Sequence, residues 1–301
     1  MQGLTGAERG FLLLTAALGD PDVKPLTRAQ LRDLTLLMRA APPLSHDHEL
    51  TARDLRKLGI GEDMAERIVK LLSREELLDL KLAQAGKRGC KCLTRISQHY
   101  PQALRNRLGS EAPGTLWYKG NADLLTQPAV ALVGSRELNP ENEAFARELG
   151  KQAALQGFTL ISGNARGADQ AAQDACLANG GHVISVVADK LEDHPEQPSI
   201  LWLSEDSFDL GFSPQRALSR NRIIHALPCL TFVAQCGLQT GGTWNGTVQN
   251  LAHQWSPVLV FSDGSPAAFV LQQKGAGLIP AEDLADIGTL ILPERTLFDD
   301  L

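Results

Sequence analysis

The sequence has few cysteines and no long apolar run. Five cysteines in 301 residues are too few for the disulfide framework that stabilises small secreted domains. No stretch of about 18 apolar residues occurs, which a membrane-spanning helix would need. The first residues lack the basic start and the apolar segment of a signal peptide. These absences predict a cytoplasmic protein without a membrane partner.

The spacing of cysteine and histidine does not indicate a metal site. Cys90 and Cys92 are two positions apart, but no second pair of cysteines or histidines follows at zinc-site spacing. We expect both to be reduced thiols on the surface. The other three cysteines lie in apolar stretches and are expected to fill the core: Cys176, Cys229 and Cys236.

Positive charge is scarce in the second part of the chain. The net charge is −6, and residues 126–301 contain 10 basic and 20 acidic side chains, against 19 and 15 in residues 1–125. An acidic total is unusual for a nucleic-acid-binding protein. Five of the ten basic residues nevertheless lie in or beside a few short motifs: Arg136, Arg166, Arg216, Arg220 and Arg222. Such local clustering indicates an anionic ligand more strongly than the total excludes one.

Residues 5–85 are predicted to be helical, because leucines recur at helical spacing. The segment Gly59-Ile60-Gly61 interrupts this pattern, so we expect one helix to end before it and another to begin at Glu62. The arrangement resembles a helix-hairpin-helix, whose turn offers N–H groups to a phosphate, but a structural turn between two packed helices explains it equally well. Glu62 and Asp63 would repel a phosphate, which favours a structural or partner-binding role.

After Pro128, short apolar runs alternate with helical segments. Strands are predicted at residues 129–133, 158–161, 183–187, 230–234 and 258–261. Helices are predicted at residues 140–156, 167–179, 215–227 and 245–254. This alternation is typical of an α/β fold, here an extended Rossmann-like parallel sheet. We expect a small N-terminal helical domain (1–85), a connector that contains one strand (86–125), a Rossmann-like phosphate- or DNA-binding core (126–265) and a C-terminal extension (266–301).

Two glycine-containing loops follow predicted strands. The first is Gly134-Ser135-Arg136, and the second runs from Ser162-Gly163 to Arg166-Gly167. Ligands of open α/β sheets bind beyond the carboxyl ends of the strands, where glycines allow close approach and helix N-termini donate N–H groups to anions. Arg136 and Arg166 would add charge-assisted contacts to phosphate. Asp169, just after the second loop, is expected to be a cap or first-turn acid of the next helix.

Two further motifs complete the predicted site. Arg220 and Arg222 are two positions apart, so on one helix their side chains would diverge by about 200°. One can face the ligand while the other pairs with an acid inside the fold. Gly241-Gly242-Thr243 again lies between a strand and a helix. One such loop is weak evidence, but four motifs in this order strongly indicate a single phosphate-binding edge.

Catalysis is not expected. A family of phosphoribohydrolases has a glycine loop similar to Gly241-Gly242-Thr243, followed by a catalytic glutamate. The helix after Thr243 has Asn and Gln in its place, which cannot act as general bases. No histidine has a serine or cysteine companion, so solvated or satisfied histidines are expected. The sequence also lacks G-x-G-x-x-G followed about 20 residues later by a ribose-binding acid. We therefore expect no catalytic residue, no metal and no cofactor.

In this order the motifs closely resemble those of the DNA-processing protein A (DprA/Smf) family, over most of residues 90–265. The resemblance implies a homodimer that binds single-stranded DNA in natural transformation, DNA uptake and recombination, and that helps to load the recombinase RecA. It implies these DNA-facing residues: Gly134, Ser135, Arg136, Ser162, Gly163, Arg166, Gly167, Arg220 and Arg222. The position of the last glycine loop between a strand and a helix adds Gly241, Gly242 and Thr243 to the predicted DNA- and phosphate-binding residues.

Three features differ from the family pattern. The segment between Val187 and Arg216 is short, the last glycine loop has a different composition, and no winged-helix pattern follows residue 265. The chain is therefore identified as a divergent member. These differences keep a second hypothesis open, in which the protein is a Rossmann-like sensor or hydrolase of a nucleotide-derived small molecule.

Overall fold

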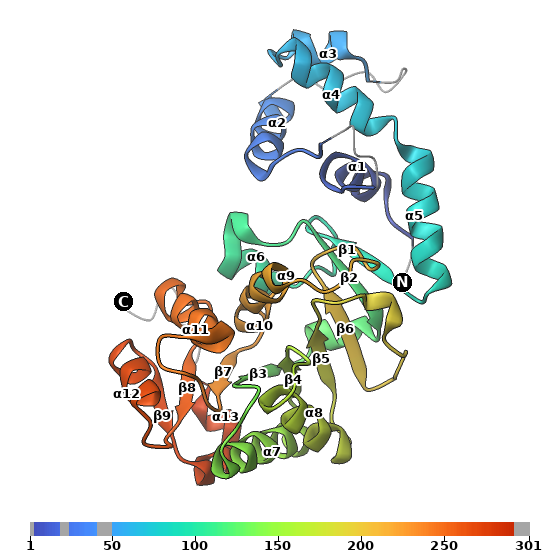
Figure 1. Cartoon of the computed structure of the whole chain (residues 1–301). Helices are drawn as coiled ribbons and strands as arrows, with labels where there is room; N and C mark the ends of the chain where they lie inside the picture. The colour runs from blue at the N-terminus through green and yellow to red at the C-terminus, as the bar shows by residue number, and fades with distance from the viewer. Residues whose placement is uncertain (1–2, 19–23, 41–49, 292–301) are drawn as a thin grey trace. The chain divides into compact units, whose positions relative to one another are not determined.

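The computed structural model describes residues 3–18, 24–40 and 50–291. The chain forms two compact units (Figure 1), one of residues 1–100 with 113–116 and one of residues 101–112 with 117–301. Residues 86–125, treated above as a connector, therefore contribute to both units. Among the described helices, none combines the length and the apolar character that crossing a bilayer requires.

The N-terminal unit is mainly helical, as predicted. Thr5 begins the first helix with a capping box, in which its side chain and that of Glu8 each bond the other's backbone N–H. Leu55, Ile68 and Leu71 are buried together in the core of this unit. Its elements are α1 (Gly6–Thr15), α2 (Arg28–Ala40), α3 (Ala52–Lys57), α4 (Glu62–Leu72), α5 (Glu75–Lys87) and β1 (Lys91–Thr94).

The glycine segment of this unit forms the predicted turn. Helix α3 ends at Lys57, and α4 begins at Glu62 with Gly61 as its N-cap. Gly59 has a φ of 87°, a left-handed conformation that a residue with a Cβ rarely adopts. The Glu62 carboxylate lies 2.6 Å from Nη1 of Arg56. The turn is confirmed, and its structural or partner-binding role stays a prediction.

The C-terminal unit has an α/β fold with one mostly parallel sheet, as predicted. The strand order is β2-β6-β5-β4-β3-β7-β8-β9, with β1 next to β2. The β2–β6 pair is antiparallel, and the other pairs from β6 to β9 are parallel. The strands are β2 (Thr115–Gly120), β3 (Ala129–Val133), β4 (Thr159–Ser162), β5 (Val183–Val186), β6 (Ile200–Ser204), β7 (Leu230–Val233), β8 (Val258–Phe261) and β9 (Gly277–Ile279).

The strand order reverses at the middle of the sheet. From β3 the chain continues to β4 and β5 on one side, whereas β7, β8 and β9 extend the sheet from the other side of β3. In this arrangement ligands bind at the carboxyl ends of the two strands where the order reverses, here β3 and β7. The site is therefore expected beyond Val133 and Val233.

Helices cover the sheet, and α7 and α8 lie side by side against it (Figure 1). The α-helices of this unit are α6 (Gln102–Leu108), α7 (Pro140–Leu155), α8 (Ala168–Ala178), α9 (Pro214–Ser219), α10 (Asn221–Ala226), α11 (Gly241–His253), α12 (Pro266–Gln273) and α13 (Ile287–Leu290). Short 3₁₀ helices are η1 (Gly109–Glu111), η2 (Ala122–Thr126), η3 (Leu191–Asp193) and η4 (Ala281–Asp286).

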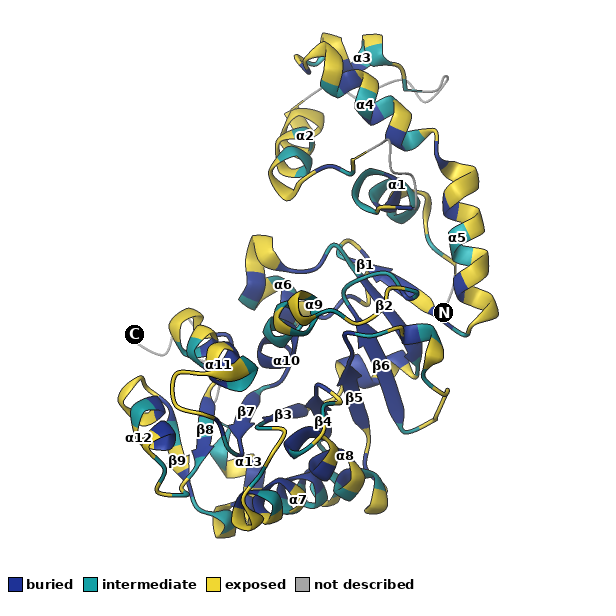
Figure 2. Cartoon of the chain, in the orientation of Figure 1, coloured by how far each residue is buried: buried dark blue, intermediate teal, exposed yellow. Residues whose placement is uncertain are grey.

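The strands form the core of this unit. Every residue of β3, β4, β5, β6 and β7 is buried, and Figure 2 shows these strands in dark blue while the outer sides of the helices are yellow. Layers on both faces bury a parallel sheet completely. This explains why the strands appear in the sequence as continuous apolar runs and not as an alternating pattern.

The predicted strands are confirmed to within one residue at each end. Several elements differ from the predictions, among them β1 and α6 in the segment that was expected to contain a single strand. Strand β6 was not predicted, because no helix separates it from β5. The helix predicted at residues 215–227 is divided into α9 and α10 at Arg220. The sheet also continues beyond residue 265 through α12 and β9.

The prediction that Cys90 and Cys92 are surface thiols is wrong. Both are buried, because Cys92 lies in the strand β1 and Cys90 lies directly before it. Cys176 and Cys236 are buried as predicted, and Cys229 is partly buried. The cysteines are all free thiols.

The contact between α7 and α8 yields a stability prediction at Gly150. A Cβ atom at this position would collide with the backbone carbonyl of Ala172, so Gly150→Ala should destabilise the protein by about 1–3 kcal/mol. Gly10→Ala in α1 meets no atom within 4 Å and should stabilise its helix by about 0.5–1 kcal/mol. Thermal unfolding of both variants tests this, and equal shifts in the same direction would contradict the close packing.

Candidate functional site

A pocket of about 700 Å³ lies at the carboxyl edge of the sheet. Its walls come from the loops that follow β3 and β7, the first turn of α11, and the α9–α10 segment. A smaller pocket of about 220 Å³ is bordered by the loops that follow β4 and β5. Five residues line both pockets, which are therefore contiguous: Arg136, Ala165, Phe212, Ala217 and Arg220.

Most of the predicted site residues border these pockets. The larger pocket is lined by Gly134, Ser135, Arg136, Arg220, Gly241, Gly242 and Thr243. The smaller one is lined by Arg136, Gly163, Arg166 and Arg220. Three predicted residues line neither pocket: Ser162, Gly167 and Arg222. The four motifs thus converge on one edge of the sheet, although not every residue in them is accessible.

The loop after β3 is held by a backbone hydrogen bond, and the side chain of its Arg136 is not used to hold it. The backbone N–H of Ser135 donates to the carbonyl of Gln235 at 2.9 Å, which ties the loop after β3 to the loop after β7. A Cβ at Gly134 would collide with the Cβ of Ala168. Arg136 is exposed, and it makes no hydrogen bond or ion pair with another described residue. Its guanidinium is therefore available to an anion.

The second loop is shaped by Asp169. Its Oδ2 accepts the N–H groups of Gly163 at 3.0 Å and of Ala165 at 3.2 Å. Asp169 lies in the first turn of α8, as predicted, although it bonds the loop before the helix. Burial raises the pKa of Asp169 to about 6, against the opposing effect of the nearby Arg220 charge.

Gly167 lets the first two loops approach each other. Its φ is +84°, and a Cβ there would collide with the carbonyls of Ser135 and Arg136. The next residue, Ala168, donates its N–H to the Ser135 carbonyl at 3.1 Å. Gly167 therefore has a packing role behind the pocket and does not line it.

Arg220 joins the ends of two strands. Its Nη1 donates to the carbonyls of Gly163 and Val186, which follow β4 and end β5. The guanidinium also interacts with the carboxylates of Asp169 and Asp189. The positive charge that it brings to the pockets is thus partly neutralised, and its hydrogen bonds serve the loops.

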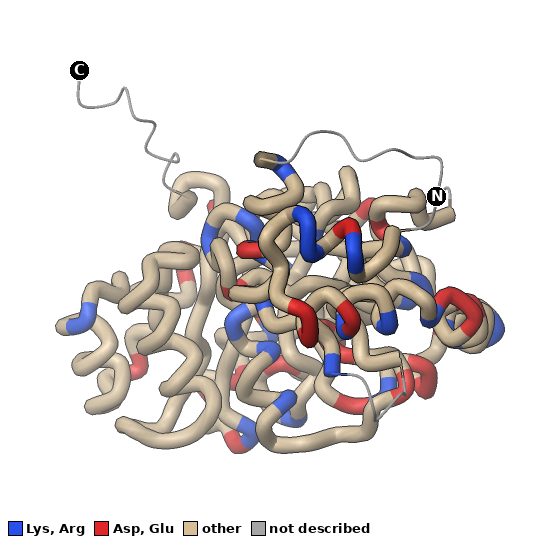
Figure 3. The backbone as a smooth tube through the Cα atoms, turned by 90° about the horizontal axis from the view of Figure 1, so that it is seen from above, with Lys and Arg blue, Asp and Glu red and all other residues tan. Residues whose placement is uncertain are grey.

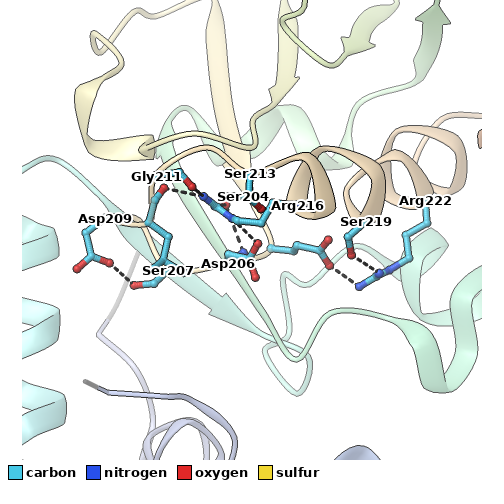
Figure 4. A network of polar contacts seen from close by, with 11 residues as sticks. Ser204, Asp206, Ser207, Asp209, Gly211, Ser213, Arg216, Ser219 and Arg222 are labelled. Carbon is cyan, nitrogen blue, oxygen red and sulfur yellow. Dashed lines mark hydrogen bonds and ion pairs between the residues drawn. The ribbon is translucent and has the colours of Figure 1, made fainter. Parts of the chain in front are cut away.

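Arg222 points elsewhere and pairs with an acid inside the fold. Its Nη2 contacts Oε2 of Glu205, whose side chain is only 7% exposed, and its Nη1 donates to Ser219. This fulfils the expectation that one of the two arginines is internal. Arg216, also in this region, bonds Asp206 at 2.7 Å and the carbonyls of Leu210 and Gly211 (Figure 4).

The last glycine motif forms the N-terminus of α11. Gly241 has a φ of +84°, and no side chain caps the helix. The hydroxyl of Thr243 donates to the Gly134 carbonyl at 2.8 Å, so this motif is bonded directly to the first. An uncapped helix N-terminus carries partial positive charge and free N–H groups, which makes it suited to an anion beside Arg136.

Among the lining residues that were not predicted, two bear on the chemistry of the smaller pocket. Asp189 follows the end of β5 and Phe212 precedes α9, and both border the smaller pocket. The position of Asp189 two residues after the predicted strand 183–187 was a usable signal. Phe212 gave none, because its place depends on how the loop between β6 and α9 folds.

The four histidines of the core, His182, His194, His225 and His253, are satisfied or solvated, as predicted. His225 borders the larger pocket, and burial lowers its pKa to about 4. Its Nδ1 lies 3.2 Å from Nδ2 of Asn250. His194 pairs with Asp189, and His182 is exposed. Among the described residues, no group of three His, Cys, Asp or Glu side chains is placed to hold a metal ion.

Comparison with known proteins identifies relatives of this arrangement. Residues 91–286 match the model of the DNA recombination-mediator protein A family. DNA processing protein DprA of Streptococcus pneumoniae is 36% identical over 141 residues, which are 44% of this chain and 50% of that protein. Protein Smf of Escherichia coli is 30% identical over 156 residues, 48% of this chain and 41% of that protein. The chain thus spans about half the length of these relatives.

Solved structures share the fold. The X-ray structure of DNA processing protein A from Streptococcus pneumoniae superimposes with a TM-score of 0.68 at 24% identity and covers 94% of this chain and 98% of its own. DNA processing protein A from Helicobacter pylori, described by its single-stranded DNA binding mode, gives a TM-score of 0.56 at 23% identity, over 66% and 94% of the two chains.

The raised pKa of Asp169 predicts a pH-dependent stability. Between the ordinary value of 3.8 and about 6, the folded protein binds the Asp169 proton more tightly than the unfolded chain does, so this group stabilises the fold as pH falls. Lowering the pH from about 7 to 5 should therefore raise the melting temperature of the wild type relative to that of Asp169→Asn.

A control variant separates this effect from general acid sensitivity. Asp174→Asn removes an exposed carboxylate from the same helix, and its melting temperature should follow the wild type across the same pH range. A constant difference between the wild type and Asp169→Asn would contradict the assignment.

Proposed function

The chain belongs to the DNA recombination-mediator protein A family, and on that premise we propose that it binds single-stranded DNA in DNA recombination. One observation carries this proposal: the exposed Arg136 and the uncapped N-terminus of α11 meet in one pocket. Both features attract phosphate. The single-stranded DNA binding mode described for the Helicobacter pylori protein supports the same ligand.

The available positive charge is local, and this limits the number of phosphates engaged. Lys and Arg are interspersed with Asp and Glu along the chain (Figure 3). Arg136 and Arg166 are exposed at the pockets, whereas Arg220 is bonded to backbone carbonyls. We propose that two or three phosphates of the strand are contacted here, and that single-stranded DNA is preferred because its backbone can bend into a pocket of this size.

The proposed role is binding without bond cleavage. Asp169 is committed to two loop N–H groups and to Arg220, and His225 contacts Asn250. The first turns of α11 contain no acidic residue. These observations support a binding protein over the sensor or hydrolase of a nucleotide-derived molecule. The family resemblance further supports action with RecA, as a homodimer, in the cytoplasm, and these finer points form part of the proposal.

Substitution of Arg136 tests the site. Arg136→Gln should weaken binding of a labelled single-stranded oligonucleotide about tenfold, because a charge-assisted contact to phosphate is worth about 1.5 kcal/mol or more. The melting temperature should not fall, since Arg136 has no hydrogen bond to lose among the described residues. Arg147→Gln is the matched control, since Arg147 is an exposed arginine on α7 that pairs with Glu143 and lines neither pocket.

Two outcomes would argue against this assignment. A less stable Arg136→Gln variant that binds normally would make Arg136 a structural residue. Equal loss of binding in the Arg136 and Arg147 variants would mean that overall charge, and not this pocket, holds the oligonucleotide.

Salt dependence separates a strand from a small ligand. For single strands, the slope of log K against log salt is about −0.7 for each phosphate contacted. With two or three phosphates, we therefore expect a slope of about −1.4 to −2 in fluorescence anisotropy titrations at salt concentrations from about 50 to about 300 mM. A mononucleotide should compete weakly. Competition by a mononucleotide at the affinity of the oligonucleotide would support the small-molecule hypothesis in its place.

A further inference from the structure

The smaller pocket differs in charge from an ordinary phosphate site. It is lined by Gly163, Arg136, Arg166 and Arg220, but also by Asp189, which follows Val187 and Ala188. A carboxylate repels a phosphate and donates no hydrogen bond when it is ionised. Asp189 interacts with the charge of Arg220, and its exposed part is suited to a ligand group that is neutral and carries a hydrogen-bond donor.

Asp189 is held in place by His194, which does not line the pocket. Its Oδ1 lies 2.8 Å from Nε2 of His194, and half of its side chain remains exposed. The His194 ring stacks on Trp202 with 4.2 Å between ring centroids, and Trp202 donates to the Pro195 carbonyl. The hydrogen bond from His194 holds the pKa of Asp189 below its ordinary value, against desolvation. The carboxylate is thus oriented and ionised at neutral pH.

An exposed aromatic ring borders the same pocket. Phe212 is 60% exposed and lines both pockets. Its loop is held by Arg216, which bonds Asp206 and the carbonyls of Leu210 and Gly211 just before the ring (Figure 4). A large apolar side chain that stays in water at a binding pocket is suited to stack with a flat ligand, and nucleobases stack on aromatic rings in single-strand binding sites.

We propose that the smaller pocket is a base-selective subsite, in which Phe212 stacks with an unpaired base and Asp189 accepts a hydrogen bond from the amino group of that base. This inference rests on the proposed binding of single-stranded DNA and concerns which base is preferred. Stacking alone is tolerant of sequence. The carboxylate adds the selectivity.

The chemistry of the carboxylate determines the preferred base. Cytosine presents the N4 amino group, from which Asp and Glu side chains accept. Thymine presents the O4 oxygen at the same position, and two acceptors repel each other. Both are pyrimidines of similar size, so they stack alike. The subsite therefore prefers cytosine to thymine.

The experiment compares oligonucleotides of two pyrimidines that carry opposite hydrogen-bonding groups at the 4-position. Fluorescence anisotropy of labelled 12-mers of dC and dT is measured at pH 7.5 with the wild type, Asp189→Asn and Asp193→Asn. The wild type should bind the dC strand about tenfold more tightly. Asp189→Asn should bind dT more tightly than the wild type does and should lose most of the dC preference, because Asn can also donate to O4.

The control variant removes the same charge nearby. Asp193 is an exposed acid that lines neither pocket. Asp193→Asn should raise affinity for both strands by a similar small factor and keep the dC preference. A change in the ratio of the two affinities therefore reports contact with the base, whereas a uniform change reports only charge.

The outcomes separate this inference from the function on which it rests. If the wild type binds neither oligonucleotide, the proposed function fails. If it binds both equally, or if the dC preference survives in Asp189→Asn, the base subsite is wrong while DNA binding stands. A comparison of rU with dU 12-mers covers the sugar: an RNA preference that disappears in Asp189→Asn would assign the carboxylate to the 2′-hydroxyl and overturn its assignment to the base.

Discussion

The geometry of the site depends on one pair of opposite charges, the buried Asp169 and the partly buried Arg220. Asp169 holds the loop after β4 through two backbone N–H groups, and Arg220 holds the start of that loop and the end of β5 through two carbonyls. Each charge offsets the cost of burying the other. Because both side chains satisfy backbone groups, the loops are ordered before any ligand arrives, and less free energy is lost when one binds.

This pair also explains how an acidic chain can present a site for anions. Most of the charge near the pockets is internally compensated: Arg222 by Glu205, Arg216 by Asp206, and Arg220 by its two neighbouring carboxylates. Arg136 and Arg166 remain exposed. A net charge of −6 then opposes diffusion of a polyanion toward the surface but does not remove the local attraction at the pocket. In such a protein, specific contacts contribute more to the free energy of binding than the electrostatic field of the net charge does.

The sequence allowed the sheet and the four motifs to be predicted, and it failed where position depends on loop folding. Buried parallel strands are continuous apolar runs in the sequence. Gly134 and Gly163 directly follow two of these runs, so the strands and the glycine loops are both indicated by local sequence patterns. The break at Arg220 was missed because residues 215–227 have a helical pattern throughout. Phe212 and Asp189 come from the stretch between β5 and α9, where no regular alternation indicates which strand follows. Neither pocket could be outlined from residue order alone, since the contact between Thr243 and Gly134 joins residues more than a hundred positions apart in the chain.

The break between α9 and α10 restricts how the length of the chain can vary. Arg220 is the C-cap of α9 and the N-cap of α10, so both helices determine the direction of its side chain. One residue added or removed on either side would turn the side chain by about 100°, away from Gly163 and Val186. The loop before Ser213 has no such constraint, because Arg216 bonds it mainly through backbone carbonyls. Insertions and deletions among relatives should therefore occur in that loop, and the spacing from Arg216 to Arg222 should stay constant.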